Sequence, residues 1–299
     1  MEELKPVQVF GDQVFYDGDF SFDERFLAVA TSREIFVYSL EGGTLLLRRI
    51  IVPKIEERIS KIKFLQESYT LVAGVGRFLA FWEGLNFDWE NYFVVSDSPI
   101  ETMDFSKRKR VILGDEKGKI VVLDLRRKEV LFEFETKDYL IGSIFSPKEK
   151  DIIAFGTGKE IYISRLGGKK EVIARLSWDR DFYFTSFDFS PLGEVLMIGA
   201  SFLSLFERHS KLIFWNFKEE EKKEIDFVGK EIKSVRFSSQ DEIFLAIGRE
   251  IVHFSKKKKR WKFSPQISQI ERLIFSPSGN YLLCLNEVSG TSLYFLSRH

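Results

Sequence analysis

Three histidines and one cysteine are the side chains of this sequence with the clearest capacity for chemistry. His209, His253 and His299 lie far apart, without the short spacing or the framing carboxylates that a metal site or a general base requires. No Gly-x-Ser-x-Gly elbow is present to hold a nucleophile. We therefore predict no catalytic residues, no metal site and no bound cofactor.

Two further candidates have simpler structural interpretations. Cys284 lies in the apolar run Leu282-Leu283-Cys284-Leu285, which indicates a small buried hydrophobic residue, and a single cysteine excludes an internal disulfide framework. The turn Gly156-Thr157-Gly158-Lys159 shares two features with a phosphate-binding loop. It lacks the upstream glycine and the following Ser or Thr that such a loop uses, and we interpret it as a turn between two strands.

Composition excludes a strong general attraction to polyanions. The chain has 299 residues, with 45 Lys plus Arg and 45 Asp plus Glu, so that its formal net charge is zero. The N-terminal residues do not resemble a signal peptide, and the longest nearly uncharged apolar stretch, residues 195–206, is too short to cross a bilayer as a helix. We expect a cytoplasmic protein with no membrane insertion.

An internal repeat positions every element of the chain. Seven segments share a phenylalanine anchor within a β-rich stretch, followed by a polar turn and an apolar run. The anchors recur every 38 to 48 residues, which is the length that four short strands with tight turns require. They are Phe20, Phe64, Phe105, Phe145, Phe189, Phe237 and Phe275.

Each repeat divides into four predicted strands, a to d. In the third repeat these are residues 101–105, 111–113, 119–125 and 129–135. The last repeat ends after its third strand, whereas residues 6–10 form a spare strand before the first repeat. We therefore predict an all-β fold: a single closed seven-bladed β-propeller over residues 1–299, with four antiparallel strands per blade and the N-terminal strand completing the last blade. Six blades with an irregular N-terminal segment is the alternative.

The repeats also resemble a known family. The stretches Phe275-Ser276-Pro277-Ser278-Gly279 and Phe189-Ser190-Pro191-Leu192-Gly193 are similar to the divergent end of the WD-repeat β-propeller family. The stretch from Phe145 to Phe155 also resembles the propeller repeats of TolB-like proteins. The WD-repeat resemblance implies a scaffold for protein–protein interactions. The Gly-His motif is absent, so the hydrogen-bond network of that family cannot be transferred to this chain.

Blade 5 departs from the repeat at one end. The connection between its strands b and c, residues 200–211, is long and apolar, and the loop that enters the blade, residues 178–184, is aromatic. Both loops belong to the same face of a propeller, so their side chains form a candidate partner-binding patch, unless the hairpin buries its own apolar residues. The candidates are Trp178, Arg180, Phe182, Tyr183, Phe202, Leu205, Phe206 and Arg208.

Basic residues gather in turns of the opposite face. Runs of Lys and Arg fall in the a–b turn of blade 3 and in the c–d turns of blades 3 and 6, and the c–d turn of blade 2 adds Phe87 and Trp89. Such a face could contact phosphate groups, although ordinary solvated turns explain the same pattern. The basic-face candidates are Lys107, Arg108, Lys109, Arg110, Arg126, Arg127, Lys128, Lys256, Lys257, Lys258 and Lys259.

These observations favour a non-enzymatic scaffold that binds one or more proteins within a larger complex. One alternative is association with nucleic acid or ribonucleoprotein through the basic face. A less favoured alternative is a propeller hydrolase or lactonase whose metal-binding carboxylates are scattered along the central channel, because scattered ligands leave no motif in a sequence.

Overall fold

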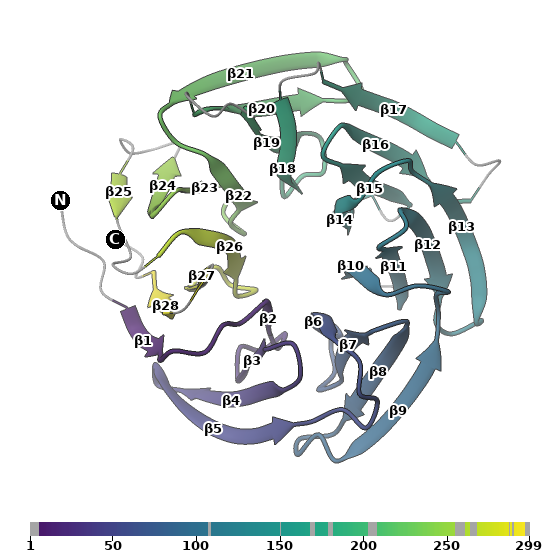
Figure 1. The fold of residues 1–299 in the computed structure, drawn as a ribbon, viewed down its shortest axis with the longest axis vertical. Coiled ribbons are helices and arrows are strands. Elements are labelled where there is room, and N and C mark those ends of the chain that lie inside the picture. The colour runs from purple at the N-terminus through teal and green to yellow at the C-terminus, as the bar shows by residue number, and fades with distance from the viewer. Residues whose placement is uncertain are drawn as a thin grey trace. The chain divides into compact units, whose positions relative to one another are not determined.

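The computed structural model describes residues 6–106, 109–149, 151–167, 171–178, 182–202, 208–254, 261–263, 268–286, 288 and 290–296. Across these residues 28 strands form seven four-stranded sheets, and no helix is present. Consecutive strands pair antiparallel within each sheet (Figure 1). The predicted fold class, an all-β chain of seven four-stranded blades, is thereby confirmed.

The chain divides into two compact units. The first unit, residues 1–101 and 263–299, contains blades 7, 1 and 2. Its strands are β1 (Pro6–Phe10), β2 (Asp17–Phe20), β3 (Phe26–Ala30), β4 (Ile35–Glu41), β5 (Thr44–Ile51), β6 (Ile59–Phe64), β7 (Leu71–Val75), β8 (Phe78–Glu83), β9 (Trp89–Val94), β26 (Ile270–Phe275), β27 (Tyr281–Asn286) and β28 (Thr291–Phe295).

The second unit, residues 102–262, contains blades 3 to 6. Its strands, the first and last of which cross the unit boundary, are β10 (Ile100–Phe105), β11 (Arg110–Asp115), β12 (Lys119–Asp124), β13 (Glu129–Glu135), β14 (Leu140–Phe145), β15 (Ile152–Thr157), β16 (Glu160–Arg165), β17 (Glu171–Ser177), β18 (Phe182–Phe189), β19 (Leu196–Phe202), β20 (His209–Asn216), β21 (Glu221–Val228), β22 (Ile232–Phe237), β23 (Ile243–Ile247), β24 (Glu250–Phe254) and β25 (Trp261–Phe263).

The N-terminal strand lies in the sheet of blade 7. That sheet has the order β1-β28-β27-β26, and β1 pairs antiparallel with β28, placing Val9 opposite Ser292 and Phe10 opposite Thr291. The aromatic ring of Phe10 packs against Phe15 and Tyr38. Closure of the propeller by this strand, and a single domain over residues 1–299, stay predictions.

The core consists of apolar layers between successive blades. One layer joins blades 1 and 2, and others join blades 3 and 4, 4 and 5, 5 and 6, and 7 and 1. Strands b and c of most blades are largely buried, because blades pack face to face within each unit. Five of the seven predicted anchors are buried, while Phe237 and Phe275 are partly exposed.

An aspartate of the first strand ties one blade to the next. Asp19 Oδ2 accepts a hydrogen bond from the backbone N–H of Phe64 at 2.7 Å. Asp104 and Asp188 make the same bond to Phe145 and Phe237, each at 2.9 Å. In blades 1, 3 and 5 the residue before the anchor phenylalanine is therefore an acceptor for the anchor of the following blade.

Candidate functional site

The residues with potential for chemistry are dispersed in the structure. His253 is buried, stacks on Phe244 with ring centroids 4.3 Å apart, and lies 3.2 Å from the Glu242 carboxylate. Burial lowers the pKa of His253, against the opposing effect of Glu242. Cys284 is fully buried, and burial raises the pKa of its thiol. In the part of the chain that the structure describes, no group of three His, Cys, Asp or Glu side chains is placed to hold a metal ion.

The glycine-rich turn of blade 4 joins β15 to β16. Thr157 Oγ1 accepts hydrogen bonds from the backbone N–H groups of Lys159 and Glu160, both at 3.1 Å. The hydroxyl therefore stabilises a tight strand connection, as the sequence predicted.

At the end of blade 5 the strands are longer than the sequence indicated. β19 continues to Phe202 and β20 begins at His209, so that the connection spans residues 203–208 rather than 200–211. Phe182, Tyr183 and Phe184 likewise belong to β18. Register explains this correction, because Phe182 pairs with Phe202 and Ser201 with Ser210. The backbone hydrogen bonds between strands do not depend on whether the side chains are apolar, so the strands continue into the stretch that was predicted as a loop.

Three predicted aromatic residues come together at this end of blade 5. The ring centroids of Trp178 and Phe182 are 5.9 Å apart, and those of Phe182 and Phe202 are 5.3 Å apart. All three side chains are partly buried, and Trp178 and Phe182 pack against the layer between blades 4 and 5. We call Trp178, Phe182 and Phe202 the blade 5 cluster.

A lysine that the sequence analysis did not single out completes the blade 5 cluster. Lys211 Nζ lies 5.8 Å from the ring centroids of both Trp178 and Phe182. It also lies 2.8 Å from Glu224 Oε2 and 3.3 Å from Asp226 Oδ1. The hydrogen bond to Glu224 raises the pKa of Lys211, so the ammonium stays charged beside the rings. No motif in the sequence marks this residue; the structure places it opposite Ala200, two residues before Phe202.

Other members of the predicted patch behave differently. Tyr183 alternates with Phe182 along β18, and its hydroxyl donates to Glu231 Oε1 at 2.7 Å. Arg208 is exposed in the connection between β19 and β20, directly before His209. Arg180, Leu205 and Phe206 lie outside the described residues.

The basic candidates of blade 3 occupy two adjacent turns. The backbone N–H of Leu125 donates to the carbonyl of Lys109 at 3.1 Å, which joins the a–b turn to the c–d turn. Arg126, Arg127 and Lys128 are exposed in the second turn, as is Lys109 in the first.

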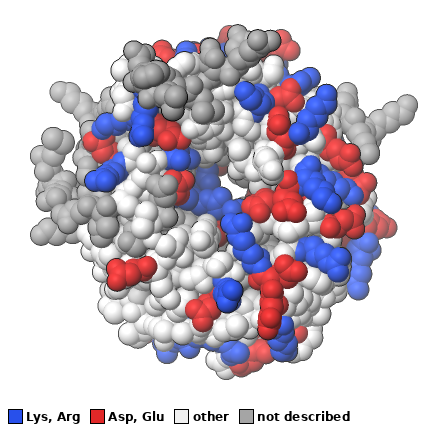
Figure 2. Space-filling model, in the orientation of Figure 1, with Lys and Arg blue, Asp and Glu red and all other residues white. Residues whose placement is uncertain are grey.

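Carboxylates lie within the same turns. Arg110 is paired with Asp151 at 2.7 Å, and Asp124 accepts from the backbone of Arg126 and Arg127. Figure 2 shows Lys and Arg interspersed with Asp and Glu over blades 3 and 4 on the face in view. Lys107, Arg108 and Lys256 to Lys259 lie outside the described residues.

The aromatic turn of blade 2 proved different from its sequence interpretation. We expected Phe87 and Trp89 on the surface, yet only Trp89 is exposed, at 60%. Phe87 is 1% exposed and packs edge-on against Phe26 and at a tilt against Phe64. Its backbone has a positive φ of 55°, which turns the side chain back into the layer between blades 1 and 2.

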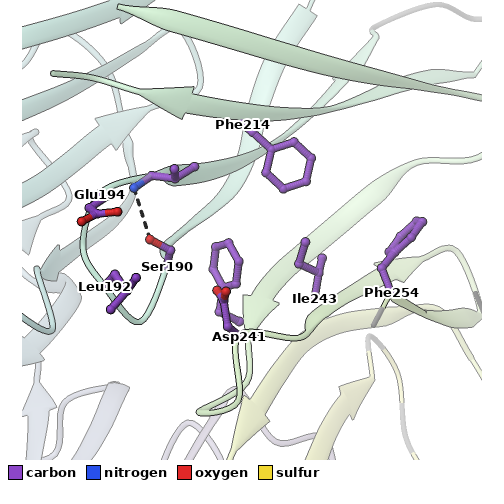
Figure 3. A pocket seen from close by; sticks show the side chains of 9 residues that line it. Ser190, Leu192, Glu194, Phe214, Asp241, Ile243 and Phe254 are labelled. Atoms are coloured by element: carbon purple, nitrogen blue, oxygen red, sulfur yellow. Dashed lines mark hydrogen bonds between the residues drawn. The ribbon is translucent and has the colours of Figure 1, made fainter. Parts of the chain in front are cut away.

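A groove between blades 5 and 6 is a feature that the sequence analysis missed. It has a volume of about 430 Å³, and we call it the blade 5–6 groove (Figure 3). Its charged side chains, Glu194 and Asp241, are both acidic. The remaining lining residues are Ser190, Leu192, Val195, Phe214, Phe237, Ile243 and Phe254.

Two equivalent a–b turns form the rim of the blade 5–6 groove. In blade 5, Gly193 N–H donates to the Ser190 carbonyl at 2.7 Å, and Ser190 Oγ accepts from Val195 N–H at 3.2 Å (Figure 3). In blade 6, Asp241 N–H donates to the Ser238 carbonyl at 3.1 Å. Gly193 and Asp241 both have a positive φ, so the two rims share one backbone geometry.

Asp188 lies in the same interface, hydrogen-bonded to the backbone N–H of the groove-lining Phe237. Burial raises the pKa of Asp188 to about 6, against the opposing effects of Arg236 and of the bond from Phe237. The hydrogen bond between these two blades is therefore accepted by a carboxylate whose charged form is less favourable here than in water.

Comparisons with known proteins bear on the fold alone. No family model matches the sequence, and no curated protein matches it. Solved structures do match, and one is a chain of a crystal structure of the mitotic checkpoint complex, with a TM-score of 0.77 and 13% sequence identity. The match covers 100% of this chain and 94% of that chain. It supports the seven-bladed β-propeller fold and assigns no function. In the described residues, no helix is long and apolar enough to cross a membrane.

Proposed function

We propose that this chain is a WD-repeat-like scaffold, without enzymatic activity of its own, that binds one or more proteins within a larger complex. Residues 1–299 act as one closed domain in this proposal, and the exposed ends of its blades carry the contacts. The primary contact is the blade 5 cluster together with Arg208.

The observation that carries the proposal is the packing of the blade 5 cluster. Trp178 and Phe182 rest on the core layer of blades 4 and 5, and Lys211 holds a charge beside their rings. Rigid, partly exposed aromatic rings with a cation nearby are the composition of interaction hot spots, because they lose little entropy on binding. The likeness to a chain of the mitotic checkpoint complex is compatible with a role in a protein assembly.

The test is capture of proteins from nuclease-treated native lysate by wild type and by variants. Trp178→Ala with Phe202→Asp should reduce recovery of a specific partner at least about tenfold, a loss of about 1.4 kcal/mol or more. Arg208→Glu, at an exposed position, should weaken capture without altering the Tm. Tyr139→Ala is the matched control, because Tyr139 is an aromatic residue that is 79% exposed on blade 4's entry loop. Capture that is equal for all variants contradicts the proposed contact.

A second candidate function, association with nucleic acid, rests on the adjacency of the two basic turns in blade 3. Its signature is binding to RNA or DNA that weakens steeply with salt. Replacing Lys109, Arg126, Arg127 and Lys128 by Gln should lower both the affinity and the salt slope. Absence of binding at low salt overturns this function and leaves the protein scaffold standing.

A further inference from the structure

In blades 1, 4 and 5, one residue at the turn between strands c and d covers the layer that the blade shares with the preceding one. Leu40, near the end of the third strand, and Leu166 and Phe217, immediately after it, are buried in the layers between blades 7 and 1, 3 and 4, and 4 and 5. Leu40 and Leu166 also donate their backbone N–H groups to carbonyls of the a–b turn, at 2.8 and 2.7 Å. We call these side chains interface caps.

Blade 2 achieves the same cover in a different way. Its sequence has Gly84 at the position of the cap, and Phe87 fills the space three residues later. The Phe87 ring lies 5.5 Å from that of Phe26 and 6.1 Å from that of the anchor Phe64. The space against an anchor phenylalanine thus accepts a large apolar side chain.

Blade 6 has no apolar residue at this sequence position. Phe237 pairs with Ile243 and Ile243 with Phe254, as Phe145 pairs with Ile153 and Ile153 with Ser164 in blade 4. In a sequence alignment on these pairs, Lys256 stands at the position of Leu166. Some members of the layer between blades 5 and 6 are fully buried, among them Leu212 and Val252. Four other members, Phe214, Phe237, Ile243 and Phe254, are only partly buried and line the blade 5–6 groove.

The charges of the blade 5–6 groove restrict its occupant. Of its nine lining residues, the two that carry charge are Glu194 and Asp241, on opposite rims. A carboxylate pair on either side of an apolar floor is complementary to cations on either side of an apolar side chain. The volume of about 430 Å³ lies within the range of sites that bind small ligands or a few residues of a peptide.

We propose that the blade 5–6 groove binds a peptide segment of a partner protein that inserts a large apolar side chain, Leu or Phe, flanked by Lys or Arg. The inserted side chain takes the place that an interface cap has in the other layers. The proposal rests on the interaction function proposed above but uses a separate site. The blade 5 cluster lies where β18 begins, at Phe182, and the groove lies beyond the end of β18, at Phe189.

The probe is a fluorescein-labelled synthetic peptide, Gly-Lys-Lys-Leu-Phe-Lys-Lys-Gly, with binding to the full chain followed by fluorescence anisotropy. Two matched peptides replace Leu-Phe by Ser-Ser, or all Lys by Glu. We expect the first peptide to bind at least about tenfold more tightly than either control. Equal affinity for all three peptides overturns the proposal. Equal affinity for the Leu-Phe and Ser-Ser peptides also overturns it, even where the Glu peptide binds more weakly.

Variants locate the binding. Leu192 is 53% exposed on the rim, so Leu192→Asp should weaken binding about tenfold while leaving the fold intact. The matched control is Leu85→Asp in blade 2, where the leucine is 56% exposed, and it should bind as wild type does. Glu194→Gln with Asp241→Asn should remove the preference for Lys over Glu and retain the preference for Leu-Phe over Ser-Ser.

Trp178→Ala separates this proposal from the function assigned to the blade 5 cluster. It should abolish capture through that cluster and leave peptide binding unchanged. Peptide binding that is lost with Trp178→Ala and kept with Leu192→Asp overturns the groove site alone.

Discussion

The interface between blades 1 and 2 and the interface between blades 5 and 6 share one hydrogen bond but differ in how their apolar surface is covered. In each, an aspartate accepts from the backbone N–H of the next anchor, Asp19 from Phe64 and Asp188 from Phe237. Beside the anchor Phe64, Phe87 fills the first interface at 1% exposure, whereas a groove of about 430 Å³ lies beside the anchor Phe237 in the second.

This difference separates two tasks within a repeat. The strands and the aspartate tie fix how one blade packs on the next, and both interfaces keep them. In the first interface, the turn after the third strand of blade 2 covers the apolar surface through Phe87. A repeat protein can therefore open a binding groove by changing one turn, because each blade contacts only its neighbours.

The largest expected effect is loss of the cap in the closed interface. Phe87→Ala removes a fully buried ring from between Phe26 and Phe64, and should lower the free energy of unfolding by about 3–5 kcal/mol. Chemical denaturation measures this. Trp89→Ala, in the same turn but 60% exposed, should cost about 0.5 kcal/mol or less. Similar costs for the two substitutions would show that Phe87 is not a cap.

A smaller effect is expected in the open interface. Phe254 lines the blade 5–6 groove and is only partly buried, so Phe254→Ala should lower the free energy of unfolding by about 1–2 kcal/mol. The same denaturation experiment compares it directly with Phe87→Ala. Equal costs would mean that the two interfaces are closed to the same degree.

A third effect concerns the tie that both interfaces share. Because the folded pKa of Asp188 is raised from 3.8 to about 6, the folded state binds more protons than the unfolded state between these values. Stability should therefore fall as the pH rises from about 4 to about 6, by about 2 kcal/mol, and this contribution should become constant above about pH 7. Asp188→Asn keeps an acceptor for Phe237 and should remove this dependence. An unchanged pH profile in the variant would place the titration elsewhere.

The repeat made the fold predictable. In blade 3 the predicted strands agree with β10 to β13 at their starts and ends to within two residues, because anchors, turns and apolar runs recur in the same order. The Asp-Phe pairs at Asp19, Asp104 and Asp188 were equally visible in the sequence. Their role was missed because a hydrogen bond to the next blade depends on residues more than 40 positions away.

The candidate sites were less predictable, for a physical reason. Turn residues were interpreted as solvated, which failed for Phe87, since a positive φ turned its ring inward. The sequence of blade 6 has no apolar residue at the position that Leu40, Leu166 and Phe217 take in blades 1, 4 and 5. The blade 5–6 groove contains no motif of its own, and only alignment of the turns after all the third strands reveals Lys256 where an apolar cap is expected.

Hydrogen–deuterium exchange of the full chain, with and without the Lys-Lys-Leu-Phe-Lys-Lys peptide, tests most directly whether the blade 5–6 groove is a binding site. Slower exchange on peptide addition is predicted in residues 190–195 and 238–243, which form the rims of the blade 5–6 groove, and no change is predicted in the corresponding turns of blades 1 and 2, residues 21–26 and 65–70. Protection spread equally over both interfaces, or absent from the groove, would contradict the account.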